Sequence, residues 1–403
     1  MQNRLALIFI LLTVTIDTIG VGIIFPVLPD LIETVTGRPI GESALWGGIL
    51  ATSFALMQFL FGPVIGNISD RYGRRPVMLT ALAIMALDYL VMAVAQTIWL
   101  LVIGRIVAGI TAATYATASA YMADISRPSE RAKNFGLIHA GFGIGFVLGP
   151  LLGGVLSTID LRAPFWAAAA IAGANFIFGL IVLPESLSPE KRRAFSWRRA
   201  NPLAAFRAIG TLPGLRPYLW VMFFYSVAFQ SYPSIWAFYG KARFGWDPSW
   251  IGLSLAIYGI SSTLVMIFAV APAIRRWGER NASIYGMGFE VATFVFFGLV
   301  RSGAWALTCL PMAAIGGVAG PAMQGYMSNA TPDDQQGELQ GVLSSIAAVA
   351  MSVSPLVMTG VFFFFTREGA LIFSPGAPFL MSALLMVVCV LILVVRPRAE
   401  VSA

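Results

Sequence analysis

The chain has 403 residues, of which 58% are hydrophobic and only 11% are charged, and its formal net charge is +7. Soluble globular domains carry about 25% charged residues, and a water-soluble core of this size could not bury so much apolar surface. These numbers exclude an ordinary soluble protein and predict an integral membrane protein. The apolar runs are too long for the strands of a membrane β-barrel, so we expect helical spans.

Twelve apolar segments are long enough to cross a bilayer as helices of about 20 residues or more. The first carries Asp17 and Pro26 and is too long for a signal peptide, so we interpret it as the first span. The predicted spans cover residues 5–29, 45–68, 76–95, 98–122, 134–157, 164–183, 217–239, 249–272, 282–300, 304–327, 338–365 and 373–395. A polar connector divides six spans from six. We therefore predict an N-terminal six-helix bundle over 1–183, a linker over 184–216 and a C-terminal six-helix bundle over 217–403.

Lysine and arginine are distributed unevenly between the two sides of the membrane. The terminal segments and the loops that follow even-numbered spans hold 19 of the 26, the opposite loops hold six, and Arg105 lies within a span. Cytoplasmic loops carry the excess of basic residues, so we predict that both termini and the linker are cytoplasmic. Because the loops of one side account for the positive charge, we expect no nucleic-acid partner.

The sequence contains an internal repeat at an offset of 205 residues. Residues 70–75 (DRYGRR) align without gaps with residues 275–280 (RRWGER). Further matches at the same offset are Tyr121-Met122 with Tyr326-Met327, Gly136 with Gly341, and Pro150 with Pro355. We therefore predict an all-α membrane protein with 12 transmembrane helices in two pseudo-symmetric six-helix bundles. Parallel repeats of this kind are typical of alternating-access transporters, whose binding site lies between the halves.

A charged hairpin, GPVIGNISDRYGRRP over residues 62–76, separates the second and third spans. One interpretation is a basic loop that only fixes the topology. Its recurrence in the second half favours another, a cytoplasmic gate that opens in every cycle and is held by exposed ion pairs of about 0.2–1 kcal/mol each. In that case Asp70 could lie at the start of span 11 across the two halves. The candidate gate residues are Gly66, Asp70, Arg71, Gly73, Arg74, Arg75, Asp124 and Arg131.

Four charged residues lie deep within predicted spans, where a charge costs about 2.5–3.5 kcal/mol on insertion scales. They are Asp17 in span 1, Asp88 in span 3, Arg105 in span 4 and Glu290 in span 9. Subtracting the repeat offset places Glu290 at position 85, one helical turn before Asp88, so the two acids occupy corresponding faces of corresponding helices. We expect this set to face the protein interior and to carry protons. The alternatives are a structural ion pair between Asp88 and Arg105 and an interhelical hydrogen bond of Asp17.

Several polar or aromatic residues in or near the spans could line a mostly apolar pocket for a drug-sized molecule. The candidates for substrate binding are Gln58, Gln230, Trp236 and Gln324. Each is equally consistent with an interhelical hydrogen bond. The phosphate-binding pattern G-x-x-x-x-G-K-[ST], the catalytic patterns H-E-x-x-H and G-x-S-x-G, and paired-cysteine zinc spacing do not occur. We therefore expect a transporter rather than an enzyme, without catalytic residues, bound metal or cofactor, and with an ion gradient as its energy source.

The motifs GNISDRYGRRP, GRIVAGITAA and GFGIGFVLGPLLGG resemble the signatures of the major facilitator superfamily, in its drug/proton antiporter branch. More narrowly, PVLPDL, GRRPVMLTALAIMALDYL, RFGWDPSWIGLSLA and GPAMQGYMSNATPDDQQGELQG resemble the bacterial tetracycline/proton antiporters. The resemblance implies that the charged hairpin is the gating loop. It also implies coupling through Asp17, Asp88, Arg105 and Glu290. The usual cargo of that family is tetracycline chelated to a divalent metal, expelled as protons enter.

The chain departs from this family pattern at two places. The tetracycline antiporters typically carry Asp where Glu290 stands, and they carry His in span 8 at about the place of Ser262. Both positions bear on coupling and on substrate choice.

We predict proton-coupled efflux of drug-like amphiphilic compounds, with tetracycline/H+ antiport by alternating access as the leading candidate. The protein would be a multi-pass protein of the bacterial inner (cytoplasmic) membrane. Its partners would be a small-molecule substrate, protons and the lipid bilayer, and a divalent cation is expected only as a companion of the substrate. The alternatives are a proton-coupled multidrug or metabolite transporter and a non-transporting membrane receptor or scaffold. The sequence gives no oligomeric state.

Overall fold

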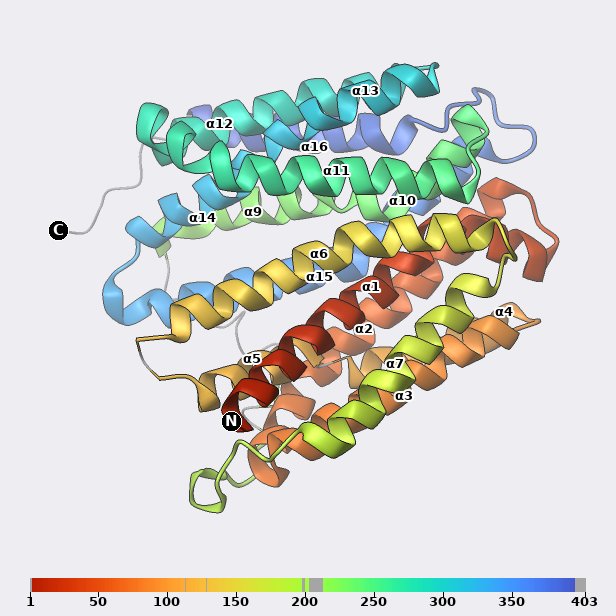
Figure 1. Ribbon diagram of the computed structural model, residues 1–403. Coiled ribbons are helices and arrows are strands. Elements are labelled where there is room, and N and C mark those ends of the chain that lie inside the picture. The colour runs from red at the N-terminus through yellow and green to blue at the C-terminus, as the bar shows by residue number, and fades with distance from the viewer. Residues whose placement is uncertain (1, 113, 128, 198–199, 203–212, 396–403) are drawn as a thin grey trace. The chain divides into compact units, whose positions relative to one another are not determined.

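The structure, a computed structural model, describes residues 2–112, 114–127, 129–197, 200–202 and 213–395. Within these ranges every regular element is a helix and no strand occurs (Figure 1). The α-helices are α1 (Gln2–Thr36), α2 (Ile40–Tyr72), α3 (Arg74–Val94), α4 (Ile98–Thr111), α5 (Thr114–Ile125), α6 (Arg131–Ser157), α7 (Ala163–Val182), α9 (Arg216–Phe229), α10 (Ser231–Phe244), α11 (Pro248–Phe268), α12 (Val270–Leu299), α13 (Gly303–Ala313), α14 (Ala319–Asn329), α15 (Gln336–Thr366) and α16 (Ala377–Val395). The 3-10 helices are η1 (Pro189–Lys191), η3 (Pro213–Leu215), η4 (Ala314–Val318) and η5 (Asp333–Gln335). Five basic residues counted in the predicted charge asymmetry lie outside the described residues: Arg198, Arg199, Arg207, Arg396 and Arg398.

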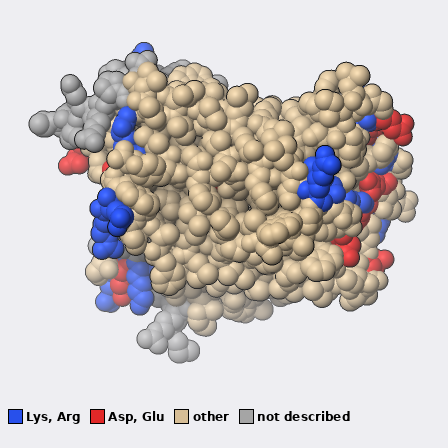
Figure 2. Space-filling view, turned by 90° about the horizontal axis from the view of Figure 1, so that it is seen from above, with Lys and Arg blue, Asp and Glu red and all other residues tan. Residues whose placement is uncertain are grey.

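Eleven helical segments among the described residues are long and apolar enough to cross a membrane. The predicted seventh span is the exception, because it consists of two 14-residue helices, α9 and α10, that meet at Gln230. Together these helices extend from Arg216 to Phe244, so the described helices fit the predicted twelve. On the face shown in Figure 2, most charged side chains gather toward two opposite ends and leave a broad, largely uncharged band between them. Such a band is what the hydrocarbon of a bilayer requires.

The internal repeat is visible in the local structure. Helix α5 begins at Thr114 and α14 begins at Ala319, 205 residues later. The regular α-helix is interrupted before each start, at Ala112 and by the 3-10 helix η4. The glycines of the charged segments also match, with φ 111° and ψ 160° at Gly73 and φ 73° and ψ 161° at Gly278. Both glycines therefore adopt a backbone conformation that side chains other than hydrogen disfavour. The same turn is thus built twice in the chain.

The chain divides into two compact units by the contacts that its residues make. Unit 1 comprises Met1–Gly37, Ser53–Pro202 and Asp247–Ala256. Unit 2 comprises Arg38–Thr52, Leu203–Trp246 and Ile257–Ala403. The start of α2 thus packs within unit 2, and the start of α11 packs within unit 1. The predicted bundle limits, which follow the order of the chain rather than its contacts, stay a prediction.

The start of α11 in unit 1 and the start of α2 in unit 2 each pack closely against a proline. These prolines, Pro150 and Pro355, are related by the repeat offset. In unit 1, Gly252 of α11 lies so close to the carbonyl oxygen of Pro150 that a Cβ atom would collide with it. In unit 2, a Cβ atom on Gly48 of α2 would lie 3.0 Å from the carbonyl oxygen of Pro355. A helical proline leaves nearby backbone carbonyl groups without their usual hydrogen bonds. Glycine at the facing position lets the neighbouring helix approach these carbonyl groups closely.

A stripe of glycines on α6 determines how α1 is held in unit 1 (Figure 1). The stripe consists of Gly141, Gly145, Gly149 and Gly153. A Cβ atom at any of the four would lie 2.5–2.8 Å from an atom of α1. Only glycine permits this approach, so the stripe fixes α1 and the acid that α1 carries, Asp17.

Candidate functional site

Asp88 and Arg105 form an ion pair inside unit 1. Asp88 on α3 is only 4% exposed, and its carboxylate contacts the guanidinium of Arg105 on α4. A Cβ atom on Gly104 would lie 2.8 Å from Asp88 Oδ1, so glycine makes room for the carboxylate. The Arg105 guanidinium also lies over the ring of Phe54, 5.4 Å from its centroid. The structure thus contains the ion pair that the sequence analysis gave as the alternative for Asp88 and Arg105, and the pair lies between α3 and α4.

Asp17 lies apart from that pair. It is half-buried on α1, its Oδ1 atom has no hydrogen-bond partner among the described residues, and the side chain of Thr114 at the start of α5 interacts with its carboxyl group. The Tyr89 hydroxyl of α3 fills the place where Gly20, one turn further along α1, would carry a Cβ atom. Among the described ion pairs, Arg105 is bonded to Asp88 and not to Asp17. Asp17 therefore has hydroxyl groups, rather than a cation, as its neighbours.

Glu290 is the buried acid of unit 2 among the described residues, with an exposed fraction of 0%. The Tyr232 hydroxyl of α10 donates a hydrogen bond to its Oε2 atom at 3.3 Å. Its Oε1 atom has no partner among the described residues and lies against η4, where a Cβ atom on Gly316 would come within 2.5 Å of it. The missing side chain of Gly316, in the 3-10 stretch η4 of the predicted tenth span, thus leaves the space that the carboxyl group occupies.

Aromatic rings surround the Glu290 site. Tyr232 stacks on Phe294 at 5.0 Å and on Tyr258 at 5.4 Å, and it lies 5.9 Å from Phe379 of α16. No arginine or lysine forms an ion pair with Glu290 within the part of the chain that the structure describes. The site is therefore an acid in an aromatic setting, held by one hydroxyl group.

The charged hairpin of unit 1 converges on Arg74. Its guanidinium bonds Asp70 at 2.7 Å and Asp124 at 3.4 Å. The linker contributes an acid that sequence reasoning left out of the site: the Glu185 carboxylate accepts hydrogen bonds from the backbone N–H groups of Arg74 and Arg75 at 2.8 and 3.2 Å. Arg75 in turn donates to the Leu180 carbonyl near the end of α7 at 2.9 Å, which satisfies a free group of that helix terminus.

Three of the predicted gate residues stand apart from this cluster. Arg71 is exposed and lies over the ring of Tyr72, 5.1 Å from its centroid. Gly66 has open space where a Cβ atom would be. Arg131, the first residue of α6, is exposed and has no ion pair within the described ranges. Whether any of the eight forms a gate stays a prediction.

Unit 2 repeats the hairpin with different chemistry. At the positions of Arg74 and Asp124, 205 residues later, stand Glu279 and Asn329, and the Asn329 amide donates to Glu279 at 2.7 Å. The Arg280 guanidinium donates to the Leu393 carbonyl of α16, as Arg75 does at the end of α7. Adding the repeat offset of 205 to Asp124, a predicted gate residue, gives Asn329, so the sequence contained a signal for this residue.

The predicted substrate-binding residues have structural neighbours of their own. Gln58 donates to the Ala112 carbonyl at 2.9 Å, at the break between α4 and α5. Gln324 donates to Gln340 at 3.1 Å, and Gln230 is the junction between α9 and α10. Trp236 is 3% exposed and packs edge-on against Phe297 at 5.1 Å. A role of these four side chains in substrate binding stays a prediction. In the described ranges, no group of three or more His, Cys, Asp or Glu residues is placed to hold a metal ion.

Long apolar helices, an internal repeat and buried acids define a polytopic membrane protein of the transporter class. A family model described as Major Facilitator Superfamily matches residues 10–355. The chain is 40% identical over 362 residues to the tetracycline resistance protein, class C, of Escherichia coli, which covers 90% of this chain and 91% of the relative. It is 37% identical over 359 residues to the class G protein of Vibrio anguillarum, which covers 89% and 91%. Among solved structures, that of the human organic anion transporter MFSD10 (TETRAN) matches with a TM-score of 0.69 and 26% identity over 97% of this chain and 99% of the other.

The chain belongs to the major facilitator superfamily. The recognition made from the sequence motifs is confirmed, and so is the predicted all-α fold of 12 transmembrane helices. The protein is a multi-pass membrane transporter for small molecules and not an enzyme.

Proposed function

We propose that this transporter exports amphiphilic drug-like molecules in exchange for protons by alternating access, and that tetracycline is its leading substrate. Two relatives that match it over most of their length, at 40% and 37% identity, are tetracycline resistance proteins. The observation that carries the proton coupling is Glu290, a fully buried carboxyl group that has a tyrosine as its partner and no ion-pair partner among the described residues.

The coupling follows from the energy of a buried charge. An isolated carboxylate in an apolar interior is far more costly than its neutral acid, whereas in water the ion is well solvated. A conformational change that moves Glu290 between a buried and a hydrated setting therefore changes how firmly it holds a proton. Proton binding and release are in this way linked to the state of the transporter.

The ion pair of unit 1 differs from Glu290 because its carboxylate has a cation partner. Asp88 and Arg105 neutralise each other, so a proton can enter there only if the pair separates. Asp17 is intermediate between Asp88 and Glu290. It has a hydroxyl neighbour, and one oxygen of its carboxyl group has no hydrogen-bond partner among the described residues. We propose Glu290 as the proton carrier and Asp17, Asp88 and Arg105 as further members of the coupling set.

The driving force is sufficient for export. One charge that crosses 100 mV gains about 2.3 kcal/mol, and each pH unit adds about 1.36 kcal/mol per proton. One proton could thus sustain a drug gradient of a few hundred-fold. We further propose that both termini lie in the cytoplasm of a bacterium, on the basis of the lysine and arginine distribution, and that the charged hairpin is a gate on that side. A divalent cation, where one is required, would travel with the substrate as cargo.

Transport into proteoliposomes tests the proposal. An imposed pH gradient should drive uptake of tetracycline by the reconstituted protein, and an ionophore that collapses the gradient should stop it. Uptake of a sugar or a peptide under the same gradient, without movement of any drug, would instead support the metabolite alternative. If no candidate solute moves in response to the gradient, proton-coupled export is wrong.

A further inference from the structure

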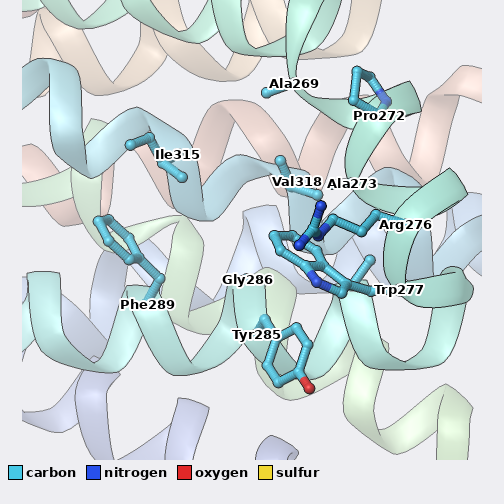
Figure 3. Close-up of a pocket in the computed structure, with 11 residues that line it drawn as sticks. Ala269, Pro272, Ala273, Arg276, Trp277, Tyr285, Gly286, Phe289, Ile315 and Val318 are labelled. Carbon is cyan, nitrogen blue, oxygen red and sulfur yellow. The ribbon is translucent and has the colours of Figure 1, made fainter.

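Each half of the chain carries an apolar groove that the transport proposal does not use. In unit 2 the groove encloses about 390 Å³ and lies between the parts of α12 on either side of Gly278, with η4 as its third wall (Figure 3). In unit 1 a groove of about 350 Å³ is lined by residues at the matching repeat positions. The matching pairs are Ile68 with Ala273, Tyr72 with Trp277, Val77 with Ala282, Thr80 with Tyr285, and Ala81 with Gly286.

Small residues form the floor of the unit 2 groove and aromatic residues form its walls. Gly286 is buried, and a Cβ atom there would lie 2.9 Å from Ala319, so the floor is closely packed. Trp277 and Tyr285 meet edge to face with their ring centroids 5.4 Å apart. These two rings are 45% and 55% exposed, as are many other large apolar side chains on the outside of the described helices. In a membrane such a surface needs an apolar occupant.

The groove also carries a cation without a counter-ion. Figure 3 shows the Arg276 side chain at the Trp277 end of the groove. Arg276 is exposed and forms no ion pair or side-chain hydrogen bond within the described ranges. Its neighbour Arg275 bonds the carbonyl oxygen of its own helix at Ala271. An unpaired guanidinium at one end of an apolar groove fits a ligand with a hydrocarbon body and an anionic end.

We propose that this groove binds a phospholipid with an anionic headgroup. One acyl chain lies along the floor against the Trp277 and Tyr285 rings, and the phosphate group binds the Arg276 guanidinium. Basic residues between helices at the membrane surface bind anionic headgroups, at about 1 kcal/mol for each cation. An anionic lipid should therefore bind about five-fold more tightly than a zwitterionic one. The proposal requires only the membrane location and does not depend on which solute the protein transports.

Fluorescence quenching in detergent micelles tests the site, because Trp277 itself lines the groove. Phosphatidylglycerol and phosphatidylcholine with brominated acyl chains are titrated against the wild-type protein and against Trp277→Phe, and the difference isolates the signal of Trp277. We expect saturable quenching with about five-fold tighter binding of brominated phosphatidylglycerol. Arg276→Gln should remove that preference, and Arg275→Gln is the matched control that should keep it.

Three results would overturn the lipid site. Equal quenching of Trp277 by both lipids would show that the headgroup is not recognised. Equal loss of preference in Arg275→Gln and Arg276→Gln would show only a general attraction to basic residues. Displacement of the brominated phosphatidylglycerol by tetracycline in a competitive titration would show that the groove is a drug site.

Discussion

The buried acids of the two units occupy corresponding places in the repeat, yet their surroundings are opposite. Asp88 of unit 1 is paired with Arg105, whereas Glu290 of unit 2 is bonded only to the hydroxyl group of Tyr232. The repeat positions explain the difference. Leu310 stands where a second arginine would be, and Val27 stands where unit 1 would need a tyrosine.

The two acids differ in whether a cation accompanies the carboxyl group. A buried pair that is neutral overall stabilises the packing of two helices as long as both partners are present. A buried acid without a cation is tolerated in its neutral form and becomes costly when it ionises. The two units thus place buried acids one helical turn apart in the repeat, in different electrostatic surroundings, and the substitutions below test that contrast.

Replacing Glu290 should have the largest effect on transport. In Glu290→Gln we expect pH-driven tetracycline accumulation to fall to the level of protein-free liposomes, because the amide cannot take up a proton. The free energy of unfolding should stay within about 1 kcal/mol of wild type, since the amide has nearly the same shape and can still accept from Tyr232. The measurements are proteoliposome flux and denaturant unfolding. Accumulation at the wild-type rate would remove Glu290 from the mechanism.

Breaking the ion pair of unit 1 should have the largest effect on stability. Arg105→Gln leaves the carboxylate of Asp88 buried without its cation, so we expect a loss of about 3–5 kcal/mol in the free energy of unfolding. The double variant Asp88→Asn with Arg105→Gln should recover more than half of that loss, because no unpaired charge remains. The free energies of unfolding of the wild type, Arg105→Gln and the double variant are measured by denaturant unfolding in the same detergent. A double variant that is no more stable than Arg105→Gln would contradict the pairing.

A methyl group beside Glu290 should disturb unit 2 to an intermediate degree. The Cβ atom of Gly316→Ala would come within 2.5 Å of the carboxyl group, and such overpacking costs about 1–3 kcal/mol. The next residue supplies a matched control, because a Cβ atom on Gly317 meets nothing within 4 Å. We expect Gly317→Ala to stay within about 0.5 kcal/mol of wild type in thermal or denaturant unfolding. Equal effects of the two alanines would mean that η4 does not shape the carboxyl site.

Much of the fold followed from the sequence for physical reasons. Apolar length alone predicted most of the spans. The 205-residue offset aligned Gly73 with Gly278, and the two glycines have similar backbone angles. The offset also placed Glu290 one turn from the position of Asp88. The high cost of charge in a span predicted correctly that both acids are buried.

The partners of those acids could not be predicted from the sequence with the same success. Hydrophobic length shows that a residue is in a span but not which neighbouring helix it faces, so it could not show that Arg105 contacts Asp88 and not Asp17. Tyr232 is one of several aromatic residues near span 7 and has no local pattern that connects it with a glutamate 58 positions away. Glu185 lies in the polar linker, where a single acid carries no signal of its own.

The smallest effect is expected at the hairpin, where the comparison between the units concerns a partly exposed pair. The Arg74 and Asp124 side chains are 12% and 25% exposed, so water screens their interaction. Unit 2 does without this ion pair, with Asn329 at the place of Asp124. We therefore expect Asp124→Asn to lose only about 0.2–1 kcal/mol in denaturant unfolding, and high salt should reduce the difference further. A salt-independent loss well above that range would mean that the hairpin, like the pair inside unit 1, is a structural element and too stable to open in every transport cycle.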